Sequence, residues 1–321
     1  MNNKINVEQI LKGSRVALAK AITLIESKKP SDRVLAQSLI NKILPHSNKS
    51  IRIGISGSPG VGKSTFIEAL GLQILSQGKK IAVLAVDPSS PVTGGSILGD
   101  KTRMEKLSRE SDVFIRPSPS SGASGGVTQK SRETILLCEA AGFDVVIVET
   151  VGVGQNEVTV SNMVDFFLVM LLPNSGDELQ GIKKGIIELA DALIINKEDG
   201  DTIQAAQQTK SQYESALRLL TPHSFWKQKV LTCSALETKN IDITWQMICE
   251  FSKESKKNGF FQQRRAKQSK DWMWSLITDS IELKLKSHPE LTTLIPQLEE
   301  MVIKETKTPQ AAASEIIKKF F

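Results

Sequence analysis

Short apolar runs alternate with longer amphipathic segments over the middle of the chain. Seven runs are nearly continuous in β-branched and large apolar residues, and they cover residues 51–56, 80–86, 112–117, 143–149, 165–172, 192–197 and 229–235. Most of them are separated by enough residues for a helix. Parallel strands that are buried on both faces have this pattern. The sequence therefore predicts an α/β fold with a doubly wound, mostly parallel sheet.

Helical periodicity replaces this pattern at both ends of the chain. Residues 5–45 have apolar side chains at helical spacing in two segments, which are separated at Lys29–Pro30. After Asn258–Gly259 the strand pattern stops, and helical spacing continues over residues 260–287, 291–305 and 309–321. We therefore expect a helical N-terminal extension over 1–48, an α/β domain over 49–255 and a helical C-terminal arm over 256–321.

The composition is that of an ordinary globular protein. Of the 321 residues, 40% are hydrophobic and 24% are charged, which excludes disordered and collagen-like classes. No stretch approaches the roughly 18 consecutive apolar residues of a membrane helix, and the first residues contain no apolar signal core. We expect a cytoplasmic protein without a membrane partner. Its three cysteines and three histidines are widely spaced, which predicts neither a disulfide framework nor a Cys/His metal cluster.

The positive charge is concentrated near the start of the C-terminal arm. The formal net charge is +6, and the segment from Lys253 to Lys270 holds seven basic residues and one acid, so the rest of the chain is close to neutral. Such a run is typical of a solvated face, while an acidic partner or nucleic acid would be the functional alternative. For Arg264 and Arg265 we favour a protein contact, and we expect no nucleic-acid partner.

The strongest chemical signal follows the first predicted strand. The sequence GSPGVGKST has the form G-x-x-x-x-G-K-[ST], and it lies between a strand ending at Ser56 and a helix beginning near Ser64. In this context backbone N–H groups can point at a phosphate, and the helix N-terminus adds partial positive charge. Lys63 would reach the terminal phosphates, and Ser64 would coordinate Mg²⁺. The alternative is a glycine-rich turn that binds nothing. The predicted nucleotide-binding loop consists of Gly57, Ser58, Pro59, Gly60, Val61, Gly62, Lys63, Ser64 and Thr65.

A second motif selects guanine over adenine. The tetrapeptide NKED follows the sixth predicted strand and fits the N-K-x-D element of GTP-binding proteins. A carboxylate at Asp199 can accept hydrogen bonds from guanine N1–H and its 2-amino group, whereas adenine would leave it unpaired. Asn196 would brace the loop, and Lys197 would lie over the base. The predicted companion loop, which presents a backbone N–H to the guanine oxygen, consists of Ser234, Ala235 and Leu236.

The fourth predicted strand ends in an acid. Glu149 is followed by Thr150, Val151 and Gly152, and GTP-binding proteins carry an acid and a glycine at this place that sense Mg²⁺ and the γ-phosphate. Ras-like proteins have a water-positioning Gln directly after the glycine, but Val153 stands here, so we expect slow intrinsic hydrolysis. The alternative for Glu149 is a hydrogen-bonded carboxylate with a structural role.

Long segments of the chain resemble one protein family. The segments DPSSPVTGGSILGDKTRM (87–104), ETVGVGQNE (149–157), PNSGDELQGIKKGIIELAD (173–191), NKED and RRAKQSKDWMW (264–274) closely resemble the methylmalonyl-CoA mutase-associated GTPases of the MeaB/ArgK type. The resemblance covers nearly the whole chain. It implies a P-loop GTPase that acts as chaperone of an adenosylcobalamin-dependent acyl-CoA mutase, with methylmalonyl-CoA mutase as the first candidate. It also implies homodimers that are joined through the C-terminal arm.

The resemblance implies further site residues. It places Mg²⁺ near Ser64, Asp87, Asp100 and Glu149, whose hard oxygen donors suit this ion. Without Mg²⁺, Asp87 and Asp100 would be helix caps or loop-bracing groups. It also relates the segment from Asp177 to Lys184 to a switch that responds to the mutase.

Within that segment we expect a catalytic cation. Lys183, or less favourably Lys184, would approach the γ-phosphate when the mutase docks, as an arginine finger does. The alternative is that both lysines are solvated. The expected catalytic residues are therefore Lys63, Glu149 and Lys183, with GTP or GDP and Mg²⁺ bound.

Two positions depart from the family, Glu198 and Asn156, where Asn156 replaces a common Ser, and other function classes remain open. Glu198 stands where the family usually has Ala, but this position faces away from the base, so we expect guanine selection to persist. A P-loop kinase or ATPase acting with an amino-acid transport system is the main alternative, although Asp199 disfavours ATP. A metal-insertion GTPase is disfavoured because the sequence has no Cys/His cluster. A nucleotide-gated scaffold without turnover is disfavoured because it would not need Lys63, Ser64 and Glu149.

Overall fold

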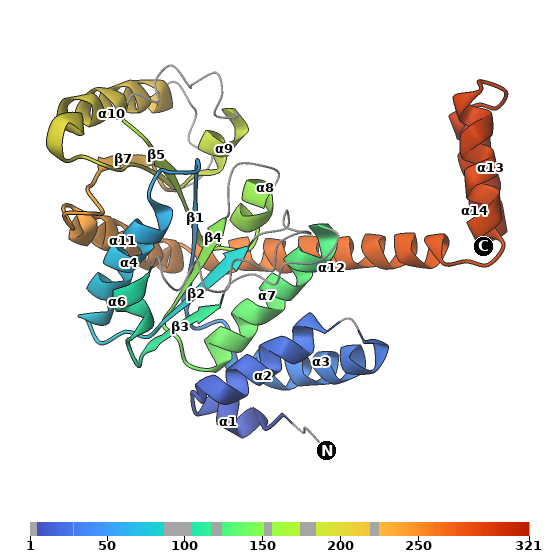
Figure 1. Cartoon of the computed structure of the whole chain (residues 1–321), viewed down its shortest axis with the longest axis horizontal. Coiled ribbons are helices and arrows are strands. Elements are labelled where there is room, and N and C mark those ends of the chain that lie inside the picture. The colour runs from blue at the N-terminus through green and yellow to red at the C-terminus, as the bar shows by residue number, and fades with distance from the viewer. Residues whose placement is uncertain are drawn as a thin grey trace. The chain divides into compact units, whose positions relative to one another are not determined.

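A computed structural model of the chain describes residues 5–27, 29–86, 104–116, 124–150, 156–173, 184–218 and 225–320 (Figure 1). Its centre is a seven-stranded sheet in the order β3-β2-β4-β1-β5-β6-β7, and every neighbouring pair is parallel. The predicted doubly wound parallel sheet is therefore confirmed. The strands are β1 (Ile51–Gly57), β2 (Ile81–Val86), β3 (Val113–Arg116), β4 (Val145–Thr150), β5 (Phe166–Leu171), β6 (Ala192–Ile195) and β7 (Lys229–Thr232).

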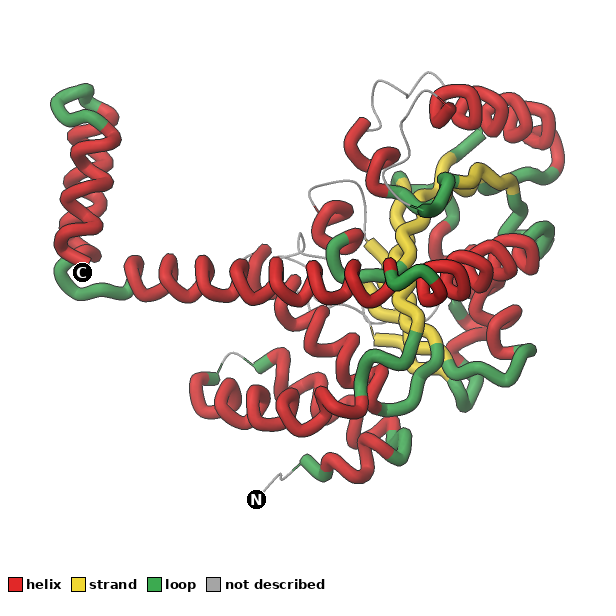
Figure 2. Tube along the Cα trace, turned by 180° about the vertical axis from the view of Figure 1, so that it is seen from behind, coloured by secondary structure: helices red, strands yellow, loops and turns green. Residues whose placement is uncertain are grey.

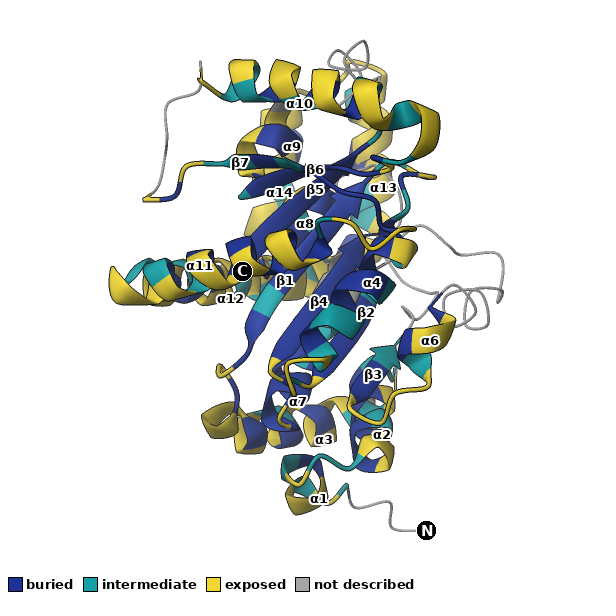
Figure 3. Cartoon of the chain, turned by 90° about the vertical axis from the view of Figure 1, so that its left-hand side faces the viewer, coloured by how far each residue is buried: buried dark blue, intermediate teal, exposed yellow. Residues whose placement is uncertain are grey.

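Helices cover both faces of the sheet, which explains why its strands are apolar throughout (Figure 2). On one face, α4 (Lys63–Leu75) and α11 (Ile241–Lys257) pack against alternate strand residues, including Ile53 and Ile55 of β1. Figure 3 shows the strands as almost entirely buried, whereas the outer sides of the helices are exposed. The remaining helices of this part are α6 (Glu105–Ser108), α7 (Ser124–Ala140), α8 (Asn156–Ser161), α9 (Lys184–Leu189), η3 (Gly200–Thr202) and α10 (Ile203–Arg218).

The N-terminal extension contains one more helix than its periodicity predicts. The elements are α1 (Val7–Leu11), α2 (Arg15–Glu26), α3 (Pro30–Ile43) and the short η1 (Leu44–His46). Gly13 has a φ of +80°, and the Ser14 side chain accepts a hydrogen bond from the Ala17 N–H, so one helix ends and another begins there. The break at Lys29–Pro30 lies where it was predicted. The helices α2 and α3 pack against α7.

The C-terminal part is helical, as the sequence predicts. Its helices are α12 (Phe260–Lys286), α13 (Leu291–Ile303) and α14 (Pro309–Phe320). Contacts divide the chain into two compact units, Met1–Arg265 and Ala266–Phe321. In the second unit, α13 and α14 pack together, and the Lys319 ammonium pairs with the Glu290 carboxylate at 2.9 Å. Within the described residues, no helix is both long enough and apolar enough to cross a membrane.

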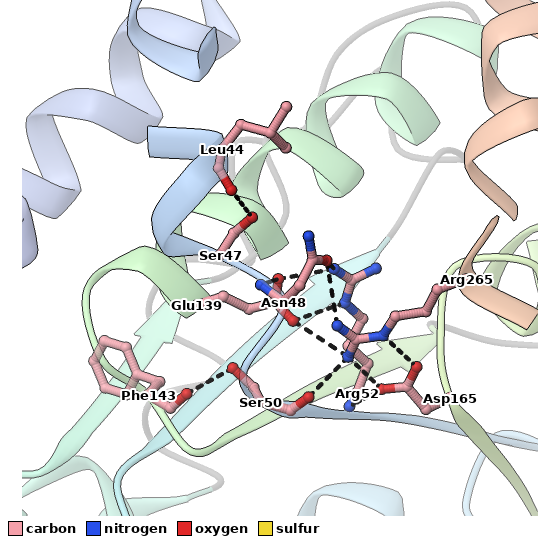
Figure 4. Close-up of polar contacts among 9 residues, drawn as sticks. All are labelled: Leu44, Ser47, Asn48, Ser50, Arg52, Glu139, Phe143, Asp165 and Arg265. Atoms are coloured by element: carbon pink, nitrogen blue, oxygen red, sulfur yellow. Dashed lines mark hydrogen bonds and ion pairs between the residues drawn. The ribbon is translucent and has the colours of Figure 1, made fainter. Parts of the chain in front are cut away.

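The two arginines at the start of α12 bind carboxylates of the same chain. Arg265 is buried and binds Asp165, which directly precedes β5, in a network that also holds Arg52 and Glu139 (Figure 4). Arg264 contacts both carboxylate oxygens of Asp191, at 3.2 and 3.0 Å. Both guanidinium groups therefore have partners within the chain, while the expected protein contact of the basic segment around them stays a prediction.

Candidate nucleotide-binding site

The predicted phosphate-binding loop lies where β1 ends and α4 begins, at the carboxyl edge of the parallel sheet. Gly62 immediately precedes α4 with a φ of +93°, and a Cβ built on it would lie 2.6 Å from Asn196 Nδ2. Only glycine fits this position without moving Asn196. The loop and the NKED segment are therefore packed directly against each other.

Lys63 lies inside this loop. Its side chain is buried, and its ammonium group donates to the carbonyl oxygens of Gly57 at 2.8 Å and Ser58 at 3.2 Å. These bonds hold the cation against the loop backbone, beside the α4 N-terminus. A cation and a helix N-terminus together favour the binding of a phosphate group.

Two of the four predicted magnesium ligands are brought together. Ser64 Oγ lies 3.5 Å from Glu149 Oε1, although the two residues are 85 positions apart in sequence. Glu149 is buried at the end of β4, and the hydroxyl of its neighbour Thr150 donates to Ser56 Oγ at 2.9 Å, which joins β4 to β1. A hydroxyl and a carboxylate are hard oxygen donors, so these residues fit Mg²⁺.

Other predicted residues lie outside the part of the chain that the structure describes. They are Asp87, Asp100 and Lys183. The described register pairs Val86 with Thr150, so the end of β2 lies beside the end of β4, and Asp87 is the next residue along the chain. Within the described residues, no cluster of three or more His, Cys, Asp or Glu side chains is assembled for a metal.

The NKED segment and the loop after β7 are joined through Asn196. Its Nδ2 donates to the carbonyl oxygen of Val61 at 2.8 Å, and its Oδ1 accepts from the N–H of Ala235 at 3.0 Å. Asn196 therefore connects the phosphate-binding loop to both predicted guanine-binding loops. The role that the sequence gives to Asn196, bracing the loop, agrees with these bonds.

Asp199 directly contacts the predicted companion loop after β7. The Ser234 hydroxyl donates to Asp199 Oδ2, and Thr202 Oγ1 donates to the Asp199 carbonyl oxygen at 2.8 Å. A carboxylate has two oxygens with about four acceptor positions, so Asp199 keeps capacity for further donors. Lys197 adopts a left-handed φ of +62°, and Leu236 is 78% exposed.

Glu198 is a site residue to which the sequence assigns no function. It is only 3% exposed, and its carboxylate accepts hydrogen bonds from Gln207 Nε2 and Asn240 Nδ2 and pairs with Lys239. Its partners lie 9 to 42 residues away in sequence, so no local motif marks them. The sequence offers one signal for this contact: Glu198 is an acid inside the NKED motif, and Lys239 and Asn240 follow the last strand.

Cys233 is buried beside Asn196 as a neutral thiol. Burial raises its pKa to about 12, and the negative charges of Glu198 and Asp199 add to this effect. The thiol donates a weak hydrogen bond to Asn196 Oδ1 at 3.4 Å. Because the thiolate is the reactive form, Cys233 acts here as a small packing residue and not as a nucleophile.

Comparison with known proteins identifies a family and several relatives of high sequence identity. Residues 18–290 match the family described as methylmalonyl Co-A mutase-associated GTPase MeaB. The GTPase ArgK of Escherichia coli is 51% identical over 84% of this chain and 81% of its own length. The mitochondrial methylmalonic aciduria type A homolog of Mus musculus is 45% identical over 97% of this chain and 78% of its own length.

A solved structure shares the fold of this chain. The crystal structure described as a LAO/AO transport system kinase has a TM-score of 0.80 and 38% sequence identity, and it covers 97% of this chain and 95% of its own. The family match extends over most of the chain, and relatives of high identity are named as GTPases. This chain therefore belongs to the methylmalonyl Co-A mutase-associated GTPase family, MeaB.

Proposed function

We propose that this protein binds GTP and hydrolyses it to GDP and phosphate. The observation that carries the proposal is the position of Asn196, which bonds the phosphate-binding loop at Val61 and the second guanine loop at Ala235. One side chain would thereby fix the distance between the phosphate-binding loop and the proposed guanine-binding loop. A preformed arrangement of this kind lowers the cost of ordering the site when the ligand binds.

The base would be selected by Asp199. Its carboxylate accepts a hydrogen bond from Ser234, and guanine would add two donors, N1–H and the 2-amino group. Adenine has neither of these two donors, because its N1 is an acceptor and its C2 carries no amino group, so adenine would leave the Asp199 carboxylate unsatisfied. A polar site of this type discriminates strongly between ligands because its unpaired groups are costly.

The phosphates would be bound by the Lys63 ammonium, the backbone N–H groups of the loop and the N-terminus of α4. Ser64 and Glu149 would hold Mg²⁺, which would neutralise charge on the β- and γ-phosphates. Asp87 and Asp100 belong to the same proposal through the family resemblance. We also propose, on the family resemblance alone, that Lys183 supplies a further positive charge when a partner docks.

The partner would be an adenosylcobalamin-dependent acyl-CoA mutase, and methylmalonyl-CoA mutase is the first candidate. The family description names this mutase, and the mouse relative carries the name of methylmalonic aciduria type A. In this proposal the protein is a chaperone that couples GTP hydrolysis to cofactor loading and to protection of the mutase.

The homodimer would form through α12. Within the second unit, apolar residues recur along α12 at spacings of three to five residues, and Met273, Ile277 and Ile281 are 38–49% exposed. Together with Trp272 and Leu276 they line a shallow groove of about 420 Å³. A stripe of this kind buries apolar area when a second helix packs on it.

The test of the function is phosphate release from GTP with Mg²⁺, measured alone and with purified methylmalonyl-CoA mutase, with ATP as the control nucleotide. We expect slow release from GTP, acceleration by the mutase and no release from ATP. If the mutase does not change the rate of phosphate release, the proposed partner is wrong, while the assignment of GTP as the nucleotide stands. Transfer of phosphate to a protein in place of water would favour the kinase alternative, to which the name of the solved LAO/AO relative corresponds.

A substitution tests the base contact independently. Asp199→Asn replaces an acceptor by an amide whose N–H can donate to the 2-oxo group of xanthine. We expect this variant to lose GTP turnover and to gain turnover of xanthosine triphosphate. If Asp199→Asn kept the nucleotide preference of the wild type, Asp199 would not contact the base.

A further inference from the structure

The loop that follows β7 is closed into a turn by its own backbone, and contacts from outside the loop hold this turn in place. Ser234 and Lys239 exchange two backbone hydrogen bonds, at 3.2 and 3.0 Å, which closes residues 234–239 into a tight turn. At its end, Thr238 and Asn240 both have left-handed φ values, +57° and +60°. A β-branched residue such as Thr238 adopts this conformation only when surrounding contacts compensate for its strain, whereas asparagine enters it at lower cost.

Those contacts converge on Glu198. Its Oε2 lies 3.2 Å from both Lys239 Nζ and Asn240 Nδ2, and its Oε1 accepts from Gln207 Nε2 of α10. Three donors from two other elements therefore surround one buried carboxylate. The Glu198 N–H also donates to the Cys233 carbonyl oxygen at 2.9 Å, so both the backbone and the side chain of Glu198 fasten this loop.

The closed turn presents the groups that orient Asp199. The Ser234 hydroxyl donates to Asp199 Oδ2, and it also accepts from the Glu237 N–H at 3.1 Å, which fixes the hydroxyl's direction. If the turn opened, Ser234 and Ala235 would move away from Asp199 and Asn196. The two guanine loops would then no longer have a fixed separation.

We propose that Glu198 is the positioning residue for guanine selection in this protein, because its carboxylate locks the 234–240 turn through Lys239, Asn240 and Gln207 and so orients Asp199. This inference rests on the proposed guanine site. Glu198 itself does not contact the nucleotide. It acts through Ser234 and Asp199, and its effect falls on base discrimination and not on phosphate chemistry.

The experiment compares the binding of GDP, IDP and ADP to the full-length protein. IDP lacks the 2-amino group, so the ratio of the IDP to the GDP dissociation constant reports how well Asp199 is oriented. For Glu198→Ala we expect roughly tenfold weaker GDP binding, because three donors lose their charged acceptor, and a clearly smaller loss for IDP. Turnover at saturating GTP should change by less than about twofold, so that KM rises while kcat is retained.

Two further variants keep the test decisive if Glu198→Ala does not fold. Lys239→Met removes the half-exposed cation while the buried Glu198 carboxylate keeps the amide donors of Gln207 and Asn240, and roughly threefold weaker GDP binding with a reduced IDP/GDP ratio is expected. Glu198→Gln keeps the size and one acceptor oxygen, so it should recover part of the loss. Glu237→Ala, an exposed glutamate in the same turn, is the matched control and should bind GDP as the wild type does.

The outcomes separate this inference from the proposed function. If the wild-type protein binds GDP no better than ADP, the guanine site itself is wrong. If the wild type prefers GDP but Glu198→Ala and Lys239→Met weaken GDP and IDP binding equally, Glu198 is only a structural residue and the inference is overturned. A reduced IDP/GDP ratio in both variants, with Glu237→Ala unchanged, supports it.

Discussion

Arg265 and Asp165 form a two-pronged ion pair: Arg265 Nε lies 2.7 Å from Asp165 Oδ1, and Nη2 lies 2.6 Å from Oδ2. The pair joins the first turns of α12 to the amino edge of the sheet, opposite the edge that carries the P-loop. Burial opposes the charge of Arg265, but its hydrogen bonds and charge interactions with Asp165 and Glu139 outweigh this and raise its pKa. Arg265 Nη2 also donates to the Ser50 carbonyl oxygen at 2.7 Å.

Arg265→Met should destabilise the protein strongly. Removing one member of a buried ion pair leaves an uncompensated charge, and the cost is about 3–5 kcal/mol. Arg265→Lys should recover only part of this, because a lysine cannot form the two parallel bonds to Asp165. Urea denaturation measures both, with Lys267→Met, an exposed position two residues away, as the control. Equal stability of Arg265→Met and the control would refute a stabilising role for this pair.

The neighbouring pair of Arg264 and Asp191 should make stability depend on pH. Burial raises the pKa of Asp191 above its usual 3.8, and the charge of Arg264 opposes this rise. An acid whose folded pKa is raised binds protons more tightly in the folded state, so the free energy of unfolding falls as pH rises through this window. In Arg264→Ala the charge that lowers the pKa of Asp191 is absent, so this pKa rises further in the folded state. The free energy of unfolding then continues to fall up to a higher pH.

We therefore expect Arg264→Ala to be destabilised by about 3 kcal/mol near neutral pH and by clearly less near pH 4.5, because protonation of Asp191 removes its uncompensated charge. Urea denaturation at both pH values measures the difference. The double variant Arg264→Ala, Asp191→Asn is the control, since it removes the titrating group. A deficit of the same size at both pH values would contradict the assignment.

Gly62→Ala should disturb the site before any nucleotide is bound. The added Cβ would lie 2.6 Å from Asn196 Nδ2, and the left-handed φ of +93° adds backbone strain. Gly60→Ala is a matched control, because its φ of +79° gives similar strain while no atom lies within 4 Å of the added Cβ. We expect the nucleotide-free Gly62→Ala protein to melt at a lower temperature than Gly60→Ala. Equal melting temperatures would show that the Asn196 contact adds no constraint.

Ser64 and Glu149 should set the magnesium requirement. The two side chains lie 3.5 Å apart, and Ser64→Ala would remove one of the two oxygen donors. The Mg²⁺ concentration for half-maximal phosphate release from GTP should rise roughly tenfold in Ser64→Ala. Ser76→Ala, at the far end of α4, provides the reference and should not change this concentration. A requirement that Ser64→Ala leaves unaltered would remove Ser64 from the metal site.

The apolar stripe of α12 should govern the oligomeric state. Ile277→Glu together with Ile281→Glu would bury two charges in a helix–helix contact, which is strongly unfavourable. Light scattering coupled to size-exclusion chromatography should show a wild-type dimer and a monomeric double variant. Ile303→Glu, at an 81% exposed position of α13, should remain dimeric. A wild-type monomer would exclude the proposed dimer, and a dimeric double variant would place the interface elsewhere.

The sequence by itself determines the fold and the kind of site. Seven apolar runs match the seven strands because a parallel sheet that is covered on both faces requires apolar residues at nearly every position. The P-loop and NKED motifs are local, since their glycines, lysine and carboxylate act within a few residues of each other. Their chemistry can therefore be inferred without knowledge of the tertiary structure.

The tertiary structure decided which distant groups meet. Glu198 and Asn240 are 42 residues apart, Ser64 and Glu149 are 85 apart, and Arg265 and Asp165 are 100 apart. Periodicity carries no information about such pairs, because it reports only whether a side chain is buried or exposed. From the sequence we therefore expect Arg264 and Arg265 to contact another protein, and only the fold shows that both cations bind carboxylates at the amino ends of β5 and β6. Burial of a charge is stable only with a partner, and only the folded chain brings that partner close.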